Sequence, residues 1–259
     1  MIAYSTIMKS LFRYYGGKFH QIKDILSILE EHRDSFDLAV DVFGGSGKVL
    51  LNIPDEWGKM KVYNDLNDDL YVTFKVLQDP EKRRALIRKL RFAFAHEKVF
   101  HEMRDSQYAG DVDRAFRLIY IQTYSFMGDS RNFGRRYKGP VRPSRFSMEN
   151  FAYVKDWTIE NMDFRDLMRK YSKPGVFFYL DPPYLSSGRK YRYSFTIDDL
   201  VDLKGCMEKH PGSYLLNLST FDKGMEEIFG EPDRIMDYTN PVHHDGERKW
   251  GCGYWWKFY

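Results

Sequence analysis

The feature that most constrains the fold is a set of short apolar runs with few polar interruptions. They occupy residues 36–43, 61–63, 176–181, 213–219 and 233–238. Continuous apolar character over so short a length is typical of strands buried on both faces, as in parallel sheets. Segments at helical spacing separate the runs, among them 21–31 and the stretch after Thr196, where Thr-Ile-Asp-Asp offers an N-cap. This alternation predicts an α/β sheet covered by helices, with residues 254–259 as a last strand paired with 233–238.

Residues 76–160 interrupt the alternation. Asp79 followed by Pro80 is typical of a helix start, and residues 85–103 continue at helical spacing. A second helix is predicted over residues 111–126. The chain thus reads as a helical insert within a sheet domain.

The length of 259 residues suits this organisation, being long for one domain and short for two. We expect a main domain of residues 1–75 and 161–259, interrupted by a subdomain of residues 76–160. Within that insert, residues 131–145 contain six basic residues and no acid. A charge run of this kind is usually a solvated loop, and a nucleic-acid surface is the alternative.

Charge, cysteine and histidine positions, and apolar stretches restrict the class of protein further. The net charge of +3 is too small to indicate nucleic acid by itself. Cys206 and Cys252 form neither a disulfide framework nor a C-x-x-C pair, and His243-His244 has no third ligand nearby, so we expect no metal site. The chain starts without a signal-peptide pattern and has no apolar stretch of about 18 residues. We therefore expect a cytoplasmic protein without a membrane span.

A glycine-rich turn follows the first apolar run. Asp41 and Phe43 end the run, and Gly44, Gly45 and Gly47 precede an expected helix. Glycines let the backbone approach a ligand, and a helix start offers unpaired N–H groups. The G-x-G-x-x-G pattern is absent, however, and a plain tight turn explains the glycines equally well.

Asp65 favours the ligand interpretation. It ends the next apolar run, 24 positions after Asp41. An acid about 20 residues beyond a glycine turn is where a ribose diol is held by a carboxylate. The alternative is that Asn64 and Asp65 only cap the following helix. The two signals together favour a ligand that contains adenosine.

The third unusual corner is Asp-Pro-Pro-Tyr, residues 181–184. At the carboxyl edge of a parallel sheet, Asp181 would face the ligand crevice. Pro182 and Pro183 cannot donate backbone hydrogen bonds, so nearby carbonyls stay available as acceptors. The carboxylate and a fixed carbonyl suit an amino group, and Tyr184 offers a face for a flat ring. A simple turn is the competing explanation.

The order and content of these motifs resemble the Dam-type DNA adenine-N6 methyltransferases, over nearly the whole chain. The shared motifs are "FRYYGGK", "DVFGGSG", "YNDLN", "NMDF" and "DPPY". The resemblance implies a Rossmann-like methyltransferase fold and S-adenosylmethionine as cofactor. It also implies that the following residues bind the cofactor: Tyr14, Lys18, Asp41, Phe43, Gly44, Gly45, Gly47, Asp65, Asp163, Phe164 and Asp181. Catalysis is implied for Asp181, Pro182, Pro183 and Tyr184.

The same resemblance gives the insert a role. It implies a target-recognition subdomain of helices plus a basic hairpin, acting on double-stranded DNA by base flipping. The implied DNA-binding residues are Arg13, Phe126, Arg131, Asn132, Arg135, Arg136 and Lys138, with Phe126 entering the base stack and Arg131 reading the target. Gly128-Asp129-Ser130 departs from the pattern of GATC readers. The target sequence therefore stays open, as do a cognate restriction endonuclease and a choice between monomer and weak dimer.

Three other functions share parts of this pattern. An RNA adenine methyltransferase would use the same "DPPY" and cofactor pocket. Protein glutamine methyltransferases favour Asn-Pro-Pro, which Asp181 argues against. A nucleic-acid-binding regulator with a vestigial cofactor fold is the non-enzymatic alternative, although Lys18, Asp65, Asp181 and Tyr184 retain suitable chemistry.

Overall fold

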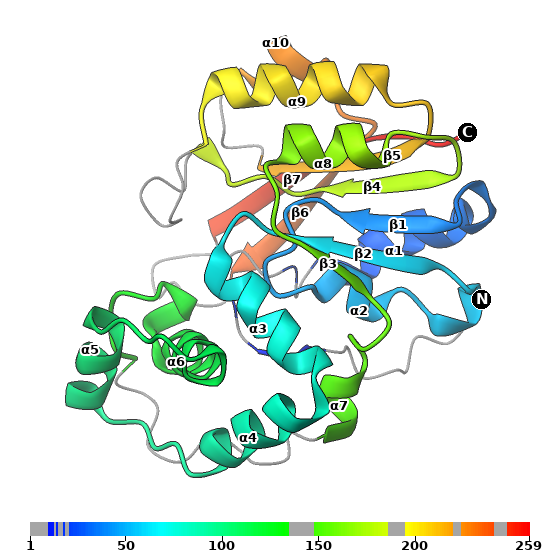
Figure 1. Ribbon diagram of the computed structural model, residues 1–259. Coiled ribbons are helices and arrows are strands. Elements are labelled where there is room, and N and C mark those ends of the chain that lie inside the picture. Colours follow the sequence, from blue (N-terminus) through cyan, green and yellow to red (C-terminus); the bar gives the residue numbers. More distant parts are fainter. Residues whose placement is uncertain are drawn as a thin grey trace.

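The centre of the molecule is a mixed sheet of seven strands in the order β3-β2-β1-β4-β5-β7-β6 (Figure 1). The computed structural model describes residues 10–12, 14, 18, 21–134, 148–185, 195–219, 224–240 and 248–259. The strands are β1 Leu38–Asp41, β2 Met60–Asn64, β3 Thr158–Glu160, β4 Val176–Leu180, β5 Ser213–Ser219, β6 Arg234–Asn240 and β7 Arg248–Lys257. Strands β1 to β5 run parallel to one another, and β7 is antiparallel to both β5 and β6. The predicted Rossmann-like α/β class is confirmed.

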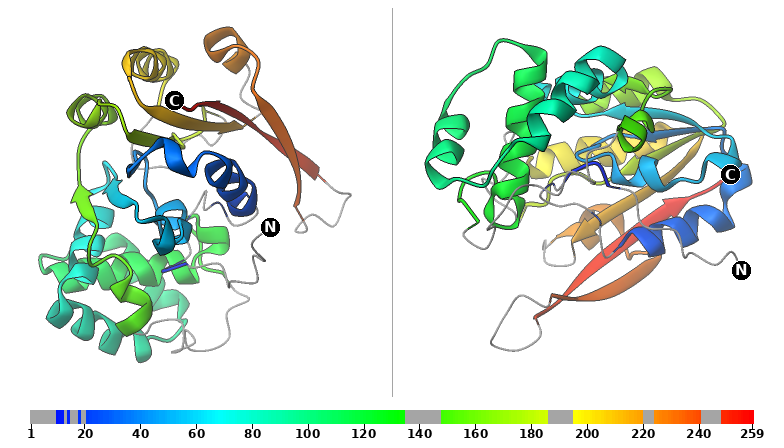
Figure 2. Two further views of the ribbon diagram at one scale, coloured as in Figure 1. Left: turned by 90° about the vertical axis from the view of Figure 1, so that its right-hand side faces the viewer. Right: turned by 90° about the horizontal axis from the view of Figure 1, so that it is seen from below.

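Helices cover both faces of the sheet. Helices α8 (Phe164–Tyr171), α9 (Ile197–Lys209) and α10 (Met225–Phe229) lie on one face, and α1 (Ile22–Glu31) and α2 (Lys48–Asn52) on the other (Figure 2). The strand residues alternate accordingly, because successive side chains point to opposite faces. In β4, for example, Phe177 and Tyr179 join the cluster under α1, whereas Val176, Phe178 and Leu180 join the cluster under α8 and α9. Both faces are buried, which is why these runs are almost entirely apolar.

The C-terminal pairing is confirmed and extends further than expected. Strand β7 begins at Arg248 rather than at residue 254, and it pairs with β6 from Arg234 opposite Tyr254 to Asn240 opposite Arg248. It also inserts between β6 and β5, where Asn217 faces Tyr254. The last segment of the chain is therefore an interior strand of the sheet.

The remaining helices gather beside the β3 edge (Figure 1). They are α3 Asp68–Gln78, α4 Pro80–Arg91, α5 Glu97–Asp105, α6 Asp111–Tyr124 and α7 Met148–Ala152. One cluster of buried side chains runs from Ala39 and Tyr63 in the sheet to Leu86 and Ile119 in these helices. The sheet and the helices on this side thus share a hydrophobic core.

The expectation of one continuous helix over residues 85–103 is wrong. Helix α4 ends at Arg91, and α5 starts only at Glu97, where the His96 side chain accepts a hydrogen bond from the Val99 N–H. The carbonyls freed in the break are used by α6, since the Tyr124 hydroxyl donates to Ala93 and the Tyr120 hydroxyl to Phe94. Tertiary partners therefore decide the break, against the local helical spacing.

Two shorter findings complete the fold. In the part of the chain that the structure describes, no helix is both long and apolar enough to cross a membrane. Within that same part, no group of three or more His, Cys, Asp or Glu side chains could hold a metal ion. The His243-His244 pair lies outside the described residues.

Candidate active site

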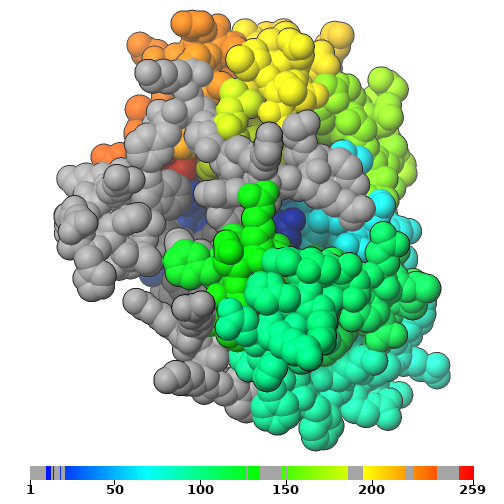
Figure 3. Space-filling view, turned by 90° about the vertical axis from the view of Figure 1, so that its left-hand side faces the viewer, coloured from blue at the N-terminus to red at the C-terminus, as the bar shows by residue number. Residues whose placement is uncertain are grey.

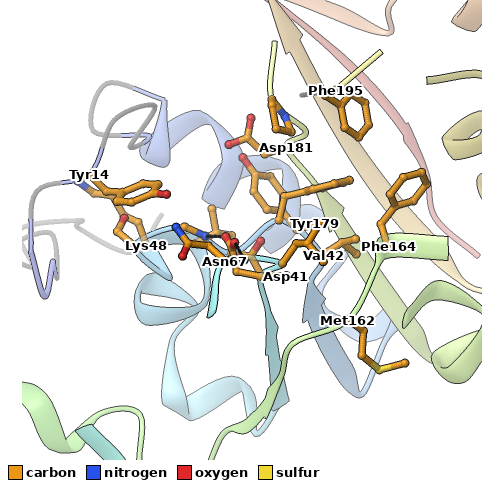
Figure 4. Close-up of a pocket in the computed structure, with 18 of the residues that line it drawn as sticks. Tyr14, Asp41, Val42, Lys48, Asn67, Met162, Phe164, Tyr179, Asp181 and Phe195 are labelled. Carbon is orange, nitrogen blue, oxygen red and sulfur yellow. Dashed lines mark hydrogen bonds between the residues drawn. The ribbon is translucent and has the colours of Figure 1, made fainter. Parts of the chain in front are cut away.

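A pocket opens where the parallel strands β1, β2 and β4 end (Figure 4). Tyr14 and Lys48 lie on one side of it, Phe164 and Phe195 on the other, and Asp41 and Tyr179 between them. The pocket brings together most of the predicted cofactor residues: Tyr14, Lys18, Asp41, Phe43, Gly44, Gly45, Asp65, Asp163, Phe164 and Asp181. Pro183, which was predicted to act in catalysis, also lines it. Gly47, Pro182 and Tyr184 are not among its lining residues. Parallel strand ends are where such folds bind ligands.

The floor of the pocket is the glycine turn between β1 and α2. A Cβ atom on Gly44 would lie 2.3 Å from the Tyr63 ring and 2.8 Å from the Asn64 carbonyl oxygen. The Gly44 N–H donates to that same carbonyl at 2.7 Å. Gly47, the N-cap of α2, has a left-handed φ of 66°. Close approach at Gly44 and backbone conformation at Gly47 explain why both positions are glycine.

Asp65 holds this turn against the end of β2. Its Oδ2 accepts from the Gly45 N–H at 2.9 Å, and its Oδ1 accepts from the Asn67 N–H at 2.8 Å. The cap of α3 is Asn67, whose side chain accepts from the Asp69 N–H, so neither Asn64 nor Asp65 is the cap. Burial raises the pKa of Asp65 to about 6 despite the two backbone hydrogen bonds. Further lone pairs of this carboxylate remain as acceptors for a ligand.

Asn64 is a structural residue of the site that sequence reasoning missed. Its amide nitrogen donates to the carbonyls of Val42 and Met162, and its amide oxygen accepts from the Met162 N–H. It thereby ties the segment after β3 to the ends of β1 and β2. A polar residue at the end of an apolar run was the available signal.

Three buried oxygen atoms of the pocket residues have no hydrogen-bond partner in the described structure. They are Asp41 Oδ1, Asp181 Oδ1 and the Tyr179 hydroxyl. Tyr179 lies opposite Asp41 in the β1–β4 register, and its ring extends toward Asp181 (Figure 4). Burial raises the pKa of both carboxyl groups, and mutual repulsion raises that of Asp41 further. The pocket is therefore short of donors and suited to a cationic ligand.

The Asp-Pro-Pro-Tyr corner is joined to the pocket through Lys18. The Lys18 ammonium forms an ion pair with Asp181 Oδ2, and it lies 5.2 Å from the centroid of the Tyr184 ring. This pair favours the charged form of Asp181 and partly offsets the effect of burial on its pKa. Lys18 is only 7% exposed, so the pair is shielded from solvent.

Aromatic rings form the far wall. The ring centroids of Phe43, Phe164 and Phe195 lie 5.6–5.8 Å apart, and the Arg165 guanidinium lies 4.3 Å from the Phe164 centroid. Asp163 caps α8 by accepting from the Arg165 N–H. Phe195, Arg165 and Met162 were not predicted, because nothing in the local sequence places them at this edge.

The residues 125–133 form a loop that closes on itself. Ser125 bridges Phe133, and the Phe126 N–H donates to the Asn132 carbonyl at 2.7 Å. The Asp129 carboxylate accepts from the backbone N–H groups of Arg131 and Asn132 and from the Asn132 amide. Asp129, which belongs to the segment that departs from the pattern of GATC readers, therefore shapes the loop.

Two side chains of the 125–133 loop remain available to a partner. Phe126 is 54% exposed. Arg131 is exposed, and only its backbone makes hydrogen bonds to the described residues. The bright green loop reaches the surface at the centre of the view in Figure 3. Asn132 is exposed as well, but its side-chain amide donates to the Asp129 carboxylate within the loop. Arg13, Arg135, Arg136 and Lys138 lie outside the described residues.

A second cleft, lined by residues of α6 and of the loop, lies beside the pocket. Tyr14 and Asn67 line both hollows, and the second extends along α6 to Arg131. Its arginines 114 and 117 are held by Asp69, with Arg114 Nη2 at 2.8 Å from Asp69 Oδ1. The two hollows are therefore adjacent, and Tyr14 and Asn67 lie at the boundary that they share.

Comparison with known proteins identifies the class of protein to which this arrangement belongs. Residues 14–213 match the model of the D12 class N6 adenine-specific DNA methyltransferases. The type II methyltransferase M.CviBI of Paramecium bursaria Chlorella virus NC1A is 23% identical over 254 residues, which cover 94% of this chain and 91% of that protein. The modification methylase StsI of Streptococcus sanguinis is 24% identical over 207 residues, 71% of this chain but 30% of that protein.

The fold and the matched motifs define an adenine-specific DNA methyltransferase. The chain belongs to the D12 class N6 adenine-specific DNA methyltransferase family. The resemblance read from the motifs is confirmed, and DNA adenine methylation is the activity of the class.

Proposed function

We propose that the protein transfers a methyl group from S-adenosylmethionine to N6 of a specific adenine in double-stranded DNA, after that base has flipped out of the helix. The observation that carries the proposal is the position of Asp181. It lines the pocket at the strand ends, and it is also the first residue of the corner that contains Tyr184. Donor and acceptor would meet at this carboxylate.

The pocket fits the proposed cofactor, which is a cation that carries an adenosine. The unpartnered oxygens of Asp41 and Asp181 suit a positive ligand rich in donors. Phe43, Phe164 and Phe195 offer apolar faces for an adenine ring, and Asp65 an acceptor for ribose hydroxyls. Tyr14 and Lys18 would close the pocket. When bound, S-adenosylmethionine supplies an activated methyl group.

The corner would hold the target adenine. A base in a duplex cannot reach this pocket, so flipping costs a few kcal/mol. Tyr184 would stack on the flipped ring, while Asp181 Oδ1 and the Pro182 carbonyl accept hydrogen bonds from its amino group. These bonds direct the nitrogen lone pair toward the methyl group, and such alignment supplies most of the acceleration. The raised pKa of Asp181 also suits it to take a proton as the amine becomes acidic.

The insert of residues 76–160 would recognise the target. Phe126 is exposed enough to enter a base stack, and the Arg131 guanidinium has donors to spare for a base edge. Asn132 would act by shaping the loop. Arg13, Arg135, Arg136 and Lys138 are proposed as phosphate contacts on sequence grounds alone. The cleft between α6 and the loop would give the strand a path to the pocket.

The partners of the protein follow from this assignment. A cognate restriction endonuclease is proposed because one relative is named a type II methyltransferase and another a modification methylase. We expect a monomer or a weak dimer in the cytoplasm.

A transfer assay tests the proposal. The protein is incubated with S-adenosylmethionine labelled in its methyl group and with duplex DNA, or with RNA of the same sequence. We expect label in N6-methyladenine of the DNA. Label in RNA alone would favour an RNA methyltransferase, and binding of DNA without transfer would favour a regulator.

A further inference from the structure

A chain of buried polar side chains runs beneath the Asp-Pro-Pro-Tyr corner. The Tyr184 hydroxyl donates to Asn217 Oδ1 at 3.4 Å, and Asn217 Nδ2 donates to Gln21 Oε1 at 3.1 Å. Gln21 Nε2 in turn donates to Cys252 Sγ at 2.8 Å. Asn217 and Cys252 are 0% exposed and Gln21 is 2% exposed. Four polar groups from distant parts of the sequence thus form one connected network.

The network is fully paired. Among the buried atoms that lack a partner in the described structure, none belongs to Gln21 or Asn217. An unpaired buried amide would be destabilising, so each member fixes the orientation of the next. Two amides in an otherwise apolar layer need a reason beyond stability, because well-packed apolar residues would serve the core at least as well.

The members of the network come from rigid elements, with one exception. Asn217 lies in β5, Cys252 in β7 and Gln21 at the N-cap of α1. Tyr184 alone lies in a loop, after β4. The network therefore attaches a loop tyrosine to the sheet and to a helix start, which is how a functional side chain is held in a fixed place.

The start of α1 also holds the other end of the corner. The Ile22 N–H donates to the Lys18 carbonyl at 2.9 Å, which places Lys18 and Gln21 in one turn. Lys18 pairs with Asp181, and Gln21 reaches Tyr184 through Asn217. A single turn of the chain thus contacts the carboxylate directly and the tyrosine through one intermediary.

We propose that Gln21 and Asn217 are positioning residues for Tyr184, and that they seat the flipped target base. This inference rests on the proposed function. Neither residue is among those that line the cofactor pocket. Their loss should therefore impair the handling of the target base and leave cofactor affinity unchanged.

The test compares Asn217→Leu in the wild-type protein and in Tyr184→Phe. Leucine keeps the branched shape of the side chain, although it is larger, and removes the hydrogen bonds. Turnover at saturating S-adenosylmethionine, the KM for duplex DNA and the fluorescence of 2-aminopurine at the target position report on the base. Calorimetry reports cofactor affinity. We expect Asn217→Leu to lower kcat/KM for DNA roughly ten- to a hundredfold and to reduce the 2-aminopurine signal. In Tyr184→Phe the same change should add less than about twofold, because the hydroxyl is already gone.

Controls separate positioning from folding. Thr73→Val removes the hydrogen bond from the buried Thr73 Oγ1 to the Asp69 carbonyl in α3, away from the network. It should leave kcat/KM for DNA and the 2-aminopurine signal unchanged. Gln21→Met with Asn217→Leu removes both amides, so that no buried amide is left unpaired, and it should show the same pattern if Asn217→Leu alone fails to fold.

Two outcomes would overturn the inference. Equal damage in both backgrounds would show that Asn217 does not act through Tyr184. A matching loss of cofactor affinity would show a general effect on the fold. A wild-type protein that transfers no methyl group to DNA would instead contradict the proposed function, before any variant is compared.

Discussion

The pocket at the strand ends and the 125–133 loop are built in opposite ways. In the pocket, Lys18, Asp41, Asp65 and Asp181 come from separate segments and are largely buried, and the three carboxyl groups have raised pKa values. In the loop, hydrogen bonds join residues a few positions apart, while Phe126 and Arg131 face outward. The proposed chemistry on an amine needs charges fixed by the whole fold, whereas the proposed reading of the DNA sequence needs exposed groups on a locally stable loop. The comparison predicts different failures in the two regions.

The largest effect is expected for Asp181. Asp181→Asn keeps the shape of the side chain but loses the charge that pairs with Lys18 and that is proposed to accept from the target amine. Methyl transfer should fall by about a thousandfold or more, measured as kcat with labelled cofactor. Asp181→Ala should also lower stability by roughly 3–5 kcal/mol, because it removes the carboxylate that pairs with the buried Lys18 ammonium.

Asp79 provides the control for this change. Its carboxylate caps α4 at the surface and lies outside the pocket. Asp79→Asn should leave transfer unchanged. Near-normal turnover of a folded Asp181→Asn protein would remove this carboxylate from the centre of the mechanism.

Asp65 should give the next effect, on cofactor rather than on DNA. Asp65→Ala removes the proposed ribose acceptor and frees the N–H groups of Gly45 and Asn67. A charged hydrogen bond of this kind contributes about 1.5–3 kcal/mol, so affinity for S-adenosylmethionine should fall roughly ten- to a hundredfold. Calorimetry with cofactor and with DNA measures the two affinities. A protein that binds cofactor normally would leave Asp65 with only its role in holding the turn.

Arg131 tests the loop. Arg131→Ala should relax preference at one base pair, at a cost of about 1–3 kcal/mol against the preferred site. Arg135→Ala or Arg136→Ala should weaken binding to every duplex alike and flatten its salt dependence, as phosphate contacts do. Methylation mapping on a randomised duplex library distinguishes the patterns. An unchanged sequence profile in Arg131→Ala would limit this residue to general attraction.

The smallest effect concerns protons. Burial raises the pKa of Asp65 from 3.8 to about 6, so below that pH the empty pocket holds an extra proton. A cationic ligand favours the carboxylate, so cofactor binding should release protons near pH 6 and none from Asp65 near pH 8. Calorimetry in two buffers of different ionisation enthalpy measures this release. Asp65→Asn should remove most of it, and proton uptake in the wild type would contradict the assignment.

The same shift fixes the sign of the stability effect. The folded protein binds this proton more tightly than the unfolded chain, so the contribution of Asp65 to stability is fully present below pH 3.8 and is lost as the pH rises through about 6. Thermal unfolding of wild type and Asp65→Asn between pH 4 and 7 should show the difference.

Sequence patterns predicted the elements whose signal is local. The apolar runs became β1, β2, β4, β5 and β6, and Thr196 forms the expected capping box with Asp199 at the start of α9. Strand β3 has only three residues and therefore no readable period. Phe92 and Phe94 continue the helical spacing of apolar residues between α4 and α5, although both are exposed. This spacing did not reveal the break, because the side chains that bond to its carbonyls lie on α6.

The same distinction applies to the site. Asp41, Asp65 and Asp181 could be predicted because each ends an apolar run, where a charge is conspicuous. Tyr179 and Asn217 could not, because a tyrosine or an asparagine within a strand has no special meaning until its partners are known. Their roles depend on residues of neighbouring strands and of α1.

The hydrogen bond between Gln21 and Cys252 joins residues 231 positions apart in the chain. Closing so large a loop is among the slow and entropically costly steps of folding. The chain loses the entropy of loop closure before the contacts between its ends can stabilise the fold. During synthesis, the helix start that bears Lys18 is made well before strand β7, which secures Gln21. The nascent protein therefore cannot complete the proposed methyl-transfer centre until β7 has left the ribosome.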